Sequence, residues 1–101
     1  MTVWVGFHRL AAQEARAAEA WYAPHSPDTA RRFRTEVSAA AMRIADNVGT
    51  HAIPETKCRY VYVRRFPYRL IYSMDDKTAL VVAVAHARRR PGYWRRRTHH
   101  P

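Results

Sequence analysis

One segment constrains the fold of this chain more than any other. Residues 79–87 read Ala-Leu-Val-Val-Ala-Val-Ala-His-Ala, so an extended strand there would be apolar on both faces. This pattern is typical of a central strand that is covered on both sides of its sheet. The chain has 101 residues, which is enough for one domain and not two. We therefore predict a single domain over residues 1–101 with this strand near its centre.

Two helical segments precede the central strand. Residues 9–22 are rich in alanine and contain no glycine or proline, which favours a helix. Ser26 is suited to cap a second helix that has Pro27 at its first position. Apolar residues at three- and four-residue steps continue this helix to about residue 47, and Gly49 is suited to a left-handed cap. The short break between the two segments predicts an antiparallel helical hairpin.

Shorter β-rich segments supply the other strands. Pro67 cannot donate to a central strand ladder, so it marks a tight link between two of them. The predicted strands are 3–7, 59–66, 68–74 and 79–87, with a loop over residues 50–58. The order β-α-α-β-β-β predicts an α+β fold, in which an N-terminal strand and a two-helix hairpin are followed by a three-stranded antiparallel sheet.

Positive charge is concentrated in the second half of the chain. The formal net charge is +10, and twelve of the eighteen Lys and Arg residues follow position 56, where only Asp75 and Asp76 oppose them. Such a field favours a polyanion or an acidic protein as partner. The alternative is a solvated face that only promotes solubility. Residues 95–101 are expected to form a flexible basic tail.

Arginines alternate with aromatic residues around the ends of the last strands. Guanidinium planes and rings together are typical of surfaces that stack unpaired bases, and also of protein interfaces. Tyr68 and Tyr72 fit a packing role equally well, because they share one strand face. Tyr93 and Trp94 follow a Pro-Gly turn and are harder to place in a core. The predicted binding residues are Arg64, Arg65, Arg69, Arg88, Arg89, Arg90, Tyr93 and Trp94.

One titratable residue stands out as a candidate for chemistry. His86 ends the apolar strand beside three arginines, which would favour a neutral imidazole that could act as a general base. The alternative is a strand-end histidine hydrogen-bonded to the backbone or to Tyr93, whereas His8, His25 and His51 at element ends are expected to be solvated. Glu14 lies close to an apolar stripe and is expected to be satisfied by an arginine.

Other site classes find no support in the sequence. Cys58 is the only cysteine, which excludes an intramolecular disulfide and a cysteine-based zinc site. No apolar run approaches the ~20 residues of a membrane span. We expect a cytoplasmic protein without metal, cofactor or membrane partner.

Several of these segments resemble the RelE/ParE superfamily of bacterial type II toxins, which are often described as plasmid stabilisation proteins. The matching segments are Trp21-Tyr22, Arg65-Phe66-Pro67-Tyr68 with Leu70-Ile71-Tyr72, Ala83-Val84-Ala85-His86, and Arg89-Arg90-Pro91-Gly92-Tyr93-Trp94. The resemblance implies a growth-inhibiting toxin that a cognate antitoxin holds inactive. We expect that antitoxin to be acidic, with carboxylates facing Arg64, Arg65 and Arg88–Arg90.

The superfamily divides by target. RelE-like members cut messenger RNA in the ribosomal A site without a metal, whereas ParE-like members poison DNA gyrase and are not nucleases. Arg69 and Tyr93 match RelE-like site residues, but Tyr60 and Tyr62 stand where such members have lysines, and Ala87 where they have an arginine. These departures favour the ParE-like mechanism.

Two alternatives remain. In a ribosome-dependent endoribonuclease, Arg65 and Arg69 would contact the phosphate, and His86 or Tyr93 would transfer the proton. In the other alternative the chain is a basic interaction module without toxicity, which binds nucleic acid through charge alone.

Overall fold

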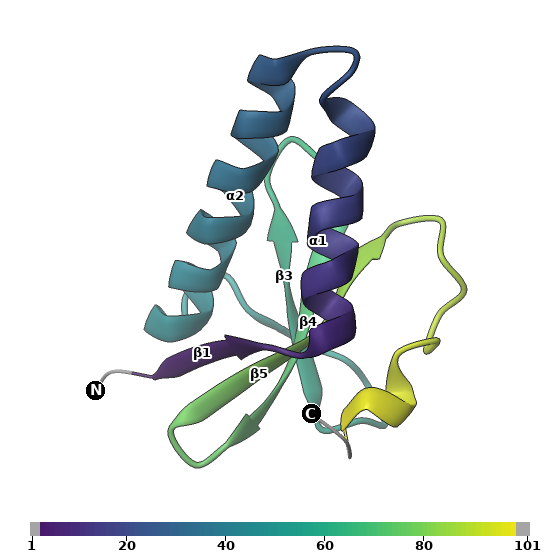
Figure 1. The fold of residues 1–101 in the computed structure, drawn as a ribbon. Coiled ribbons are helices and arrows are strands. Elements are labelled where there is room, and N and C mark those ends of the chain that lie inside the picture. Colours follow the sequence, from purple (N-terminus) through teal and green to yellow (C-terminus); the bar gives the residue numbers. More distant parts are fainter. Residues whose placement is uncertain (1–2, 99–101) are drawn as a thin grey trace.

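The two helices and the longer strands follow one another in the order that the apolar patterns predict. The computed structural model describes residues 3–98 and places a five-stranded sheet behind two helices (Figure 1). The elements are β1 (Trp4–Phe7), α1 (Arg9–Tyr22), α2 (Pro27–Asp46), β2 (His51–Ala52), β3 (Cys58–Val63), β4 (Tyr68–Asp75), β5 (Thr78–His86) and the 3-10 helix η1 (Arg95–Thr98). The predicted α+β class is confirmed.

The strand order is β1-β5-β4-β3-β2, so the apolar β5 is an interior strand between β1 and β4, as its pattern predicted, and β4 is the middle strand. It pairs with β1 in parallel and with β4 antiparallel. The register shifts between Ile71 and Tyr72, and Val82 has no partner in β4 as a result. The bulge places Val82 and Ala83 on one side of the sheet, and Val81 and Val84 pack on the other.

The sheet has more strands than the three-stranded antiparallel unit that we predicted. The N-terminal strand β1 joins the same sheet, because its backbone pairs with the free edge of β5 from Trp4 opposite Thr78 to Phe7 opposite Val81. The predicted loop over residues 50–58 contains the two-residue strand β2, which pairs with β3 through His51 opposite Tyr60. Such a short strand has no hydrophobic pattern from which to predict it.

The two helices form the predicted hairpin and cover one face of the sheet (Figure 1). Ser26 caps α2 by accepting a hydrogen bond from the Thr29 amide at 3.2 Å. The left-handed residue at the end of α2 is Asn47, with φ of 54°, rather than Gly49. His8 is buried and not solvated, because its Nδ1 accepts from the Leu10 amide and caps α1.

Strand β3 ends at Val63 and does not continue to residue 66. Residues 64–67 form the turn into β4, in which Arg65 takes the left-handed backbone with φ of 70°. The Phe66 amide donates to the Val63 carbonyl, and the Tyr68 amide donates to the Phe66 carbonyl. The turn points Phe66 toward the helices, where its ring packs edge-on against Phe33 at 5.1 Å. The predicted strand extended to residue 66 because Phe66 is apolar. Phe66 is apolar because its ring packs against the helices, not because it continues the strand.

The C-terminal segment covers the second face of the sheet. Trp94 is only 4% exposed and packs with Cys58, Ile71, Val82, Ala83 and Ala85. The prediction that Trp94 belongs to a binding surface is therefore wrong, because its ring fills the core on this side. The expected flexible tail also differs from the structure over Arg95–Thr98, which form η1. Residues 99–101 of that predicted tail lie outside the described residues.

Replacing Trp94 tests this second core, and Trp21 on α1 offers a matched control because it is 65% exposed. We expect Trp94→Ala to lower the free energy of unfolding by about 3–5 kcal/mol, the usual cost of truncating a buried aromatic ring. Trp21→Ala should lower it by less than about 1 kcal/mol. Urea unfolding measures both changes. Equal changes in the two variants would contradict the placement of Trp94 in the core.

Candidate functional site

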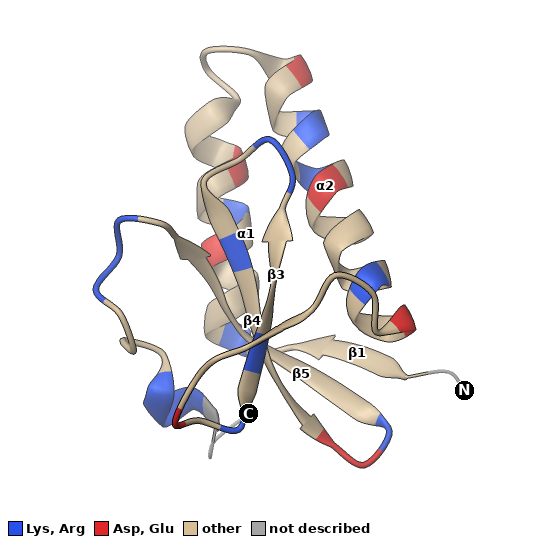
Figure 2. Ribbon diagram, turned by 180° about the vertical axis from the view of Figure 1, so that it is seen from behind, with Lys and Arg blue, Asp and Glu red and all other residues tan. Residues whose placement is uncertain are grey.

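Five predicted binding arginines gather at one end of the sheet. Arg64 and Arg65 lie in the β3–β4 turn, and Arg88, Arg89 and Arg90 follow the end of β5. The pairing of Tyr68 with His86 and the hydrogen bond from the Ala87 amide to the Pro67 carbonyl join these two segments. Figure 2 shows both as basic segments around this end of the sheet. We call these five residues the arginine rim.

The acidic side chains of the protein do not neutralise the rim. Within residues 3–98, the salt bridges join Arg31 to Asp28, Arg34 to Glu19 and Arg97 to Glu14. All five rim residues are exposed. Burial and the positive charge of Arg64 both lower the pKa of Arg43 on α2. The rim is thus a concentrated positive field that is available to an anionic partner.

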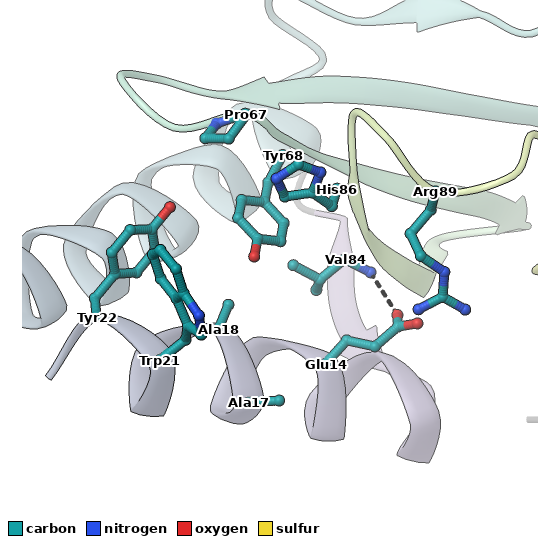
Figure 3. Close-up of a pocket in the computed structure, with 10 residues that line it drawn as sticks. All are labelled: Glu14, Ala17, Ala18, Trp21, Tyr22, Pro67, Tyr68, Val84, His86 and Arg89. Carbon is teal, nitrogen blue, oxygen red and sulfur yellow. Dashed lines mark hydrogen bonds between the residues drawn. The ribbon is translucent and has the colours of Figure 1, made fainter. Parts of the chain in front are cut away.

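A groove borders the rim on the helical side of the sheet (Figure 3). It lies between α1 and the adjoining ends of β4 and β5 and has a volume of about 500 Å³. Its residues are Glu14, Ala17, Ala18, Trp21, Tyr22, Pro67, Tyr68, Val84, His86 and Arg89. The small alanines of α1 keep the floor open, and the exposed Trp21 ring stands at one end. We call it the α1 groove.

The Glu14 carboxylate fixes the other end of the α1 groove. Its Oε1 accepts hydrogen bonds from the Val84 amide and from Nη1 of Arg97, each at 3.0 Å, and its Oε2 accepts from the Tyr93 hydroxyl at 2.9 Å. Arg97 also donates to the Val82 carbonyl at 3.1 Å. The expectation that an arginine satisfies Glu14 is confirmed. The arginine comes from the segment that we had expected to be a flexible tail.

The side chains of Glu14 and Arg97 complete the edge of β5. Strand β1 pairs with β5 only as far as Phe7 opposite Val81, so the next residues of β5 lack a strand neighbour on that side. A buried backbone group without a partner is costly. Glu14 accepts from the Val84 amide, and Arg97 donates to the Val82 carbonyl, which gives both groups a partner.

The residues proposed for a ribonuclease do not converge. Arg69 lies on the face of the sheet away from the helices, where its guanidinium covers the Tyr60 ring at 4.6 Å. His86 lies on the helical face, against the Tyr68 ring. Tyr93 donates to Glu14, and Arg65 sits in the β3–β4 turn. The sheet therefore separates Arg69 from His86, the general base of that alternative.

The partner of His86 is the backbone. Its Nδ1 accepts a hydrogen bond from the Arg88 amide at 3.0 Å. This contact matches the structural alternative considered for His86 and helps to hold the start of the arginine segment after β5. The Tyr93 hydroxyl bonds to Glu14 instead, while the Tyr93 ring lies under the guanidinium of Arg89 at 3.9 Å.

The sequence analysis missed an aromatic cluster on the sheet face away from the helices. His51 stacks on Tyr60 at 5.0 Å, Tyr62 lies edge-on to Tyr60 at 5.4 Å, and Arg69 covers Tyr60. Tyr62 is 54% exposed, and its hydrogen bond with Tyr60 raises its pKa. We call His51, Tyr60, Tyr62 and Arg69 the tyrosine face. The alternation of Tyr60 and Tyr62 was a visible signal, but β2 and the strand register were needed to bring His51 and Arg69 to it.

Residues 3–98 contain neither a metal-binding cluster nor a membrane-spanning helix. No group of three or more histidine, cysteine or acidic residues in the described part of the chain is arranged to hold a metal ion. None of the helices there has the length and apolar character that a membrane crossing requires.

The sequence of residues 5–91 matches the family model described as the ParE toxin of the type II toxin-antitoxin system parDE. The chain belongs to the ParE toxin family. This result confirms the predicted superfamily and the predicted ParE-like subgroup. A search of curated proteins finds no significant match to this ParE-family toxin.

The fold of this ParE-family toxin is similar to that of a solved chain. That chain comes from the chromosomal ParDE toxin-antitoxin system of P. aeruginosa, and the TM-score is 0.71. The two sequences are 13% identical, and the match covers 84% of this chain and 96% of the other. At this identity the comparison supports the fold alone. The evidence for the rim and the groove is the placement of the residues described above.

The Tyr93–Glu14 contact makes the stability of this ParE-family toxin depend on pH. Burial, followed by the hydrogen bond to Glu14, raises the pKa of Tyr93 from 10.0 to about 12. The folded state therefore favours the neutral hydroxyl. Its stabilising contribution is complete below a pH of about 10 and is lost as the pH rises toward about 12.

A Tyr93→Phe variant lacks this titration. We expect its free energy of unfolding to fall less steeply than that of the wild type between pH values of about 10 and 12. Tyr22 and Tyr68, whose pKa values are raised by burial, titrate in both proteins and cancel in the difference. Urea unfolding across this range measures the two slopes. Parallel curves would show that folding does not raise the pKa of Tyr93.

Proposed function

We propose that this toxin inhibits growth by acting on DNA gyrase and that a cognate acidic antitoxin neutralises it. The observation that carries the proposal is the match to the ParE toxin family over residues 5–91. Two features of the molecule support it: an arginine rim that takes part in none of the salt bridges within residues 3–98, and a largely apolar groove beside it.

The α1 groove and the arginine rim would each make one kind of contact with the antitoxin. An apolar segment of the antitoxin would lie in the α1 groove against Trp21 and Tyr68, and its carboxylates would face Arg89 and the rest of the rim. Apolar anchors supply most of the binding energy of such segments, and complementary charges guide their approach and register. A helix or extended chain with acidic residues on one side fits both requirements.

Two observations support gyrase as the target. One is the family of the chain, and the other is that the candidate ribonuclease residues do not converge on one site. ParE-like members of the superfamily that the sequence resembles poison gyrase. A ribonuclease would need cations and a proton-transfer group around one phosphate. Here Arg69 and His86 lie on opposite faces of the sheet, and the Tyr93 hydroxyl bonds to Glu14. This separation supports a binding mechanism over cleavage of messenger RNA.

A supercoiling assay tests the gyrase target. Purified toxin added to gyrase, ATP and plasmid should block supercoiling and increase the amount of cleaved plasmid. Arg90→Glu should weaken this effect about tenfold or more, since reversing a charge in a complementary interface costs several kcal/mol. Arg32→Glu changes the net charge equally at an exposed position of α2 and should leave the effect nearly unchanged.

Three results would contradict this proposal. Unchanged supercoiling together with an unchanged cleavage-complex level would exclude gyrase. Primer extension that shows A-site cuts in translated messages during growth arrest would establish the ribonuclease instead. Expression without any effect on growth would favour the non-toxic interaction module.

Co-purification tests the antitoxin surface. A small acidic protein encoded beside this gene should form a stable complex with the toxin. Trp21→Ala in the groove and Arg89→Glu in the rim should each weaken the complex about tenfold or more. Trp4→Ala removes an equally exposed tryptophan from β1 and should have little effect. No complex, or equal losses in all three variants, would contradict the proposed surface.

A further inference from the structure

We propose that the tyrosine face is a binding site for single-stranded nucleic acid, distinct from the α1 groove. In this site unpaired bases stack on Tyr62 and His51, and Arg69 contacts a phosphate. The site is separate from the α1 groove, because its residues lie on the sheet face away from the helices and do not line the groove.

The three rings of this cluster form a compact triangle on two strands, and Arg69 extends the cluster onto a third strand. His51 on β2 is paired with Tyr60 on β3, and Tyr62 on β3 is paired with Arg69 on β4. The ring centroids are 5.0 to 5.6 Å apart, and both the Tyr62 and His51 side chains are exposed. Because the strands fix the positions, a stacking base would meet an ordered set of rings at little cost in side-chain entropy.

Within the described residues 3–98, this part of the sheet stays partly exposed. The C-terminal segment packs Trp94 over the same face, but the apolar cluster that it forms ends at the partly buried Tyr60. Tyr62, two residues further along β3, is 54% exposed. Exposed rings on a sheet surface next to a covered core are the arrangement on which bases stack in sheet-based binding modules.

The charged residues around the tyrosine face suit the binding of a phosphate backbone. Arg69 forms none of the three salt bridges within residues 3–98. Beyond Tyr62 and Arg69, the same hairpin leads directly into Arg64 and Arg65 of the rim. Glu55 and Asp75 line a different pocket, around Cys58 at the opposite end of β3. A polyanion would therefore run from the rings toward the rim.

Nucleic acid fits the cluster better than a protein does. The four side chains offer ring faces and a guanidinium group, and none of them is aliphatic. The ring faces of all bases are equivalent for stacking, so this site would bind without strong sequence preference. Duplex DNA keeps its bases paired and stacked, so only its phosphates would be available to the tyrosine face.

The test measures binding of fluorescent 12-nucleotide oligonucleotides to the full-length toxin by anisotropy, with single-stranded DNA, single-stranded RNA and duplex DNA as separate arms. We expect either or both single strands to bind more tightly than the duplex, and their order identifies the natural source. Tyr62→Ala should weaken single-strand binding about 5- to 100-fold, the usual effect of losing one stacking ring. Tyr62→Phe keeps the ring and should retain most of the affinity.

Salt dependence separates stacking from charge. Arg69→Ala should reduce the slope of log affinity against log salt by about 0.7, the value for one phosphate contact to a single strand, whereas Tyr62→Ala should leave the slope unchanged. Trp4→Ala and Arg32→Ala remove an exposed ring and an exposed charge elsewhere and serve as matched controls. Thermal unfolding confirms that each variant is folded.

Three outcomes would overturn the proposal. If the duplex binds as tightly as the single strands or more tightly, the affinity depends on net charge alone and not on stacking. Equal effects of Tyr62→Ala and Trp4→Ala would remove the tyrosine face from the site. A Tyr62→Ala variant that loses affinity for an antitoxin or gyrase, but not for oligonucleotides, would show that the cluster contacts protein. None of these outcomes decides whether the toxin inhibits gyrase.

Discussion

The carboxylate of Glu14 joins three parts of the molecule that are distant in sequence. From the middle of α1 it accepts hydrogen bonds from the β5 backbone at Val84, from Tyr93 and from Arg97. The side chains of Glu14 and Arg97 are 17% and 14% exposed, so their ion pair is largely protected from solvent. Breaking one partner of such a pair leaves a buried charge without compensation, which is strongly destabilising. The position of the whole C-terminal segment depends on this contact.

That position shapes both surfaces of the protein. On one side, Arg89 stacks on Tyr93 and so stays at the border of the α1 groove. On the other, Trp94 fills the second core and ends the covered part of the sheet near Tyr60. The same short segment therefore holds one end of the groove, supports the rim and leaves the tyrosine face open.

The patterns that were predictive from sequence are local or strictly periodic. Ser26 before Pro27 fixed the start of α2, and the uninterrupted apolar run of β5 identified an interior strand of the sheet. The arginine rim was also predictable, because strand ends in adjoining hairpins meet at one end of a sheet.

The features that could not be predicted from the sequence depend on contacts between residues that are distant in the chain. Trp94 looked like a surface residue because its partners, such as Cys58 and Val82, lie on other strands. Arg69 and His86 looked like members of one site, but strand register places them on opposite faces. The tyrosine face needed β2, whose two residues carry no periodic signal.

A double-mutant cycle between Glu14→Gln and Arg97→Met tests the central contact most directly. The free energies of unfolding of the wild type, both single variants and the double variant are compared. If the ion pair anchors the C-terminal segment, the two changes will be coupled by about 1–3 kcal/mol, because either single variant already loses the pair. Additive effects, with a coupling energy below about 0.5 kcal/mol, would contradict that anchoring role.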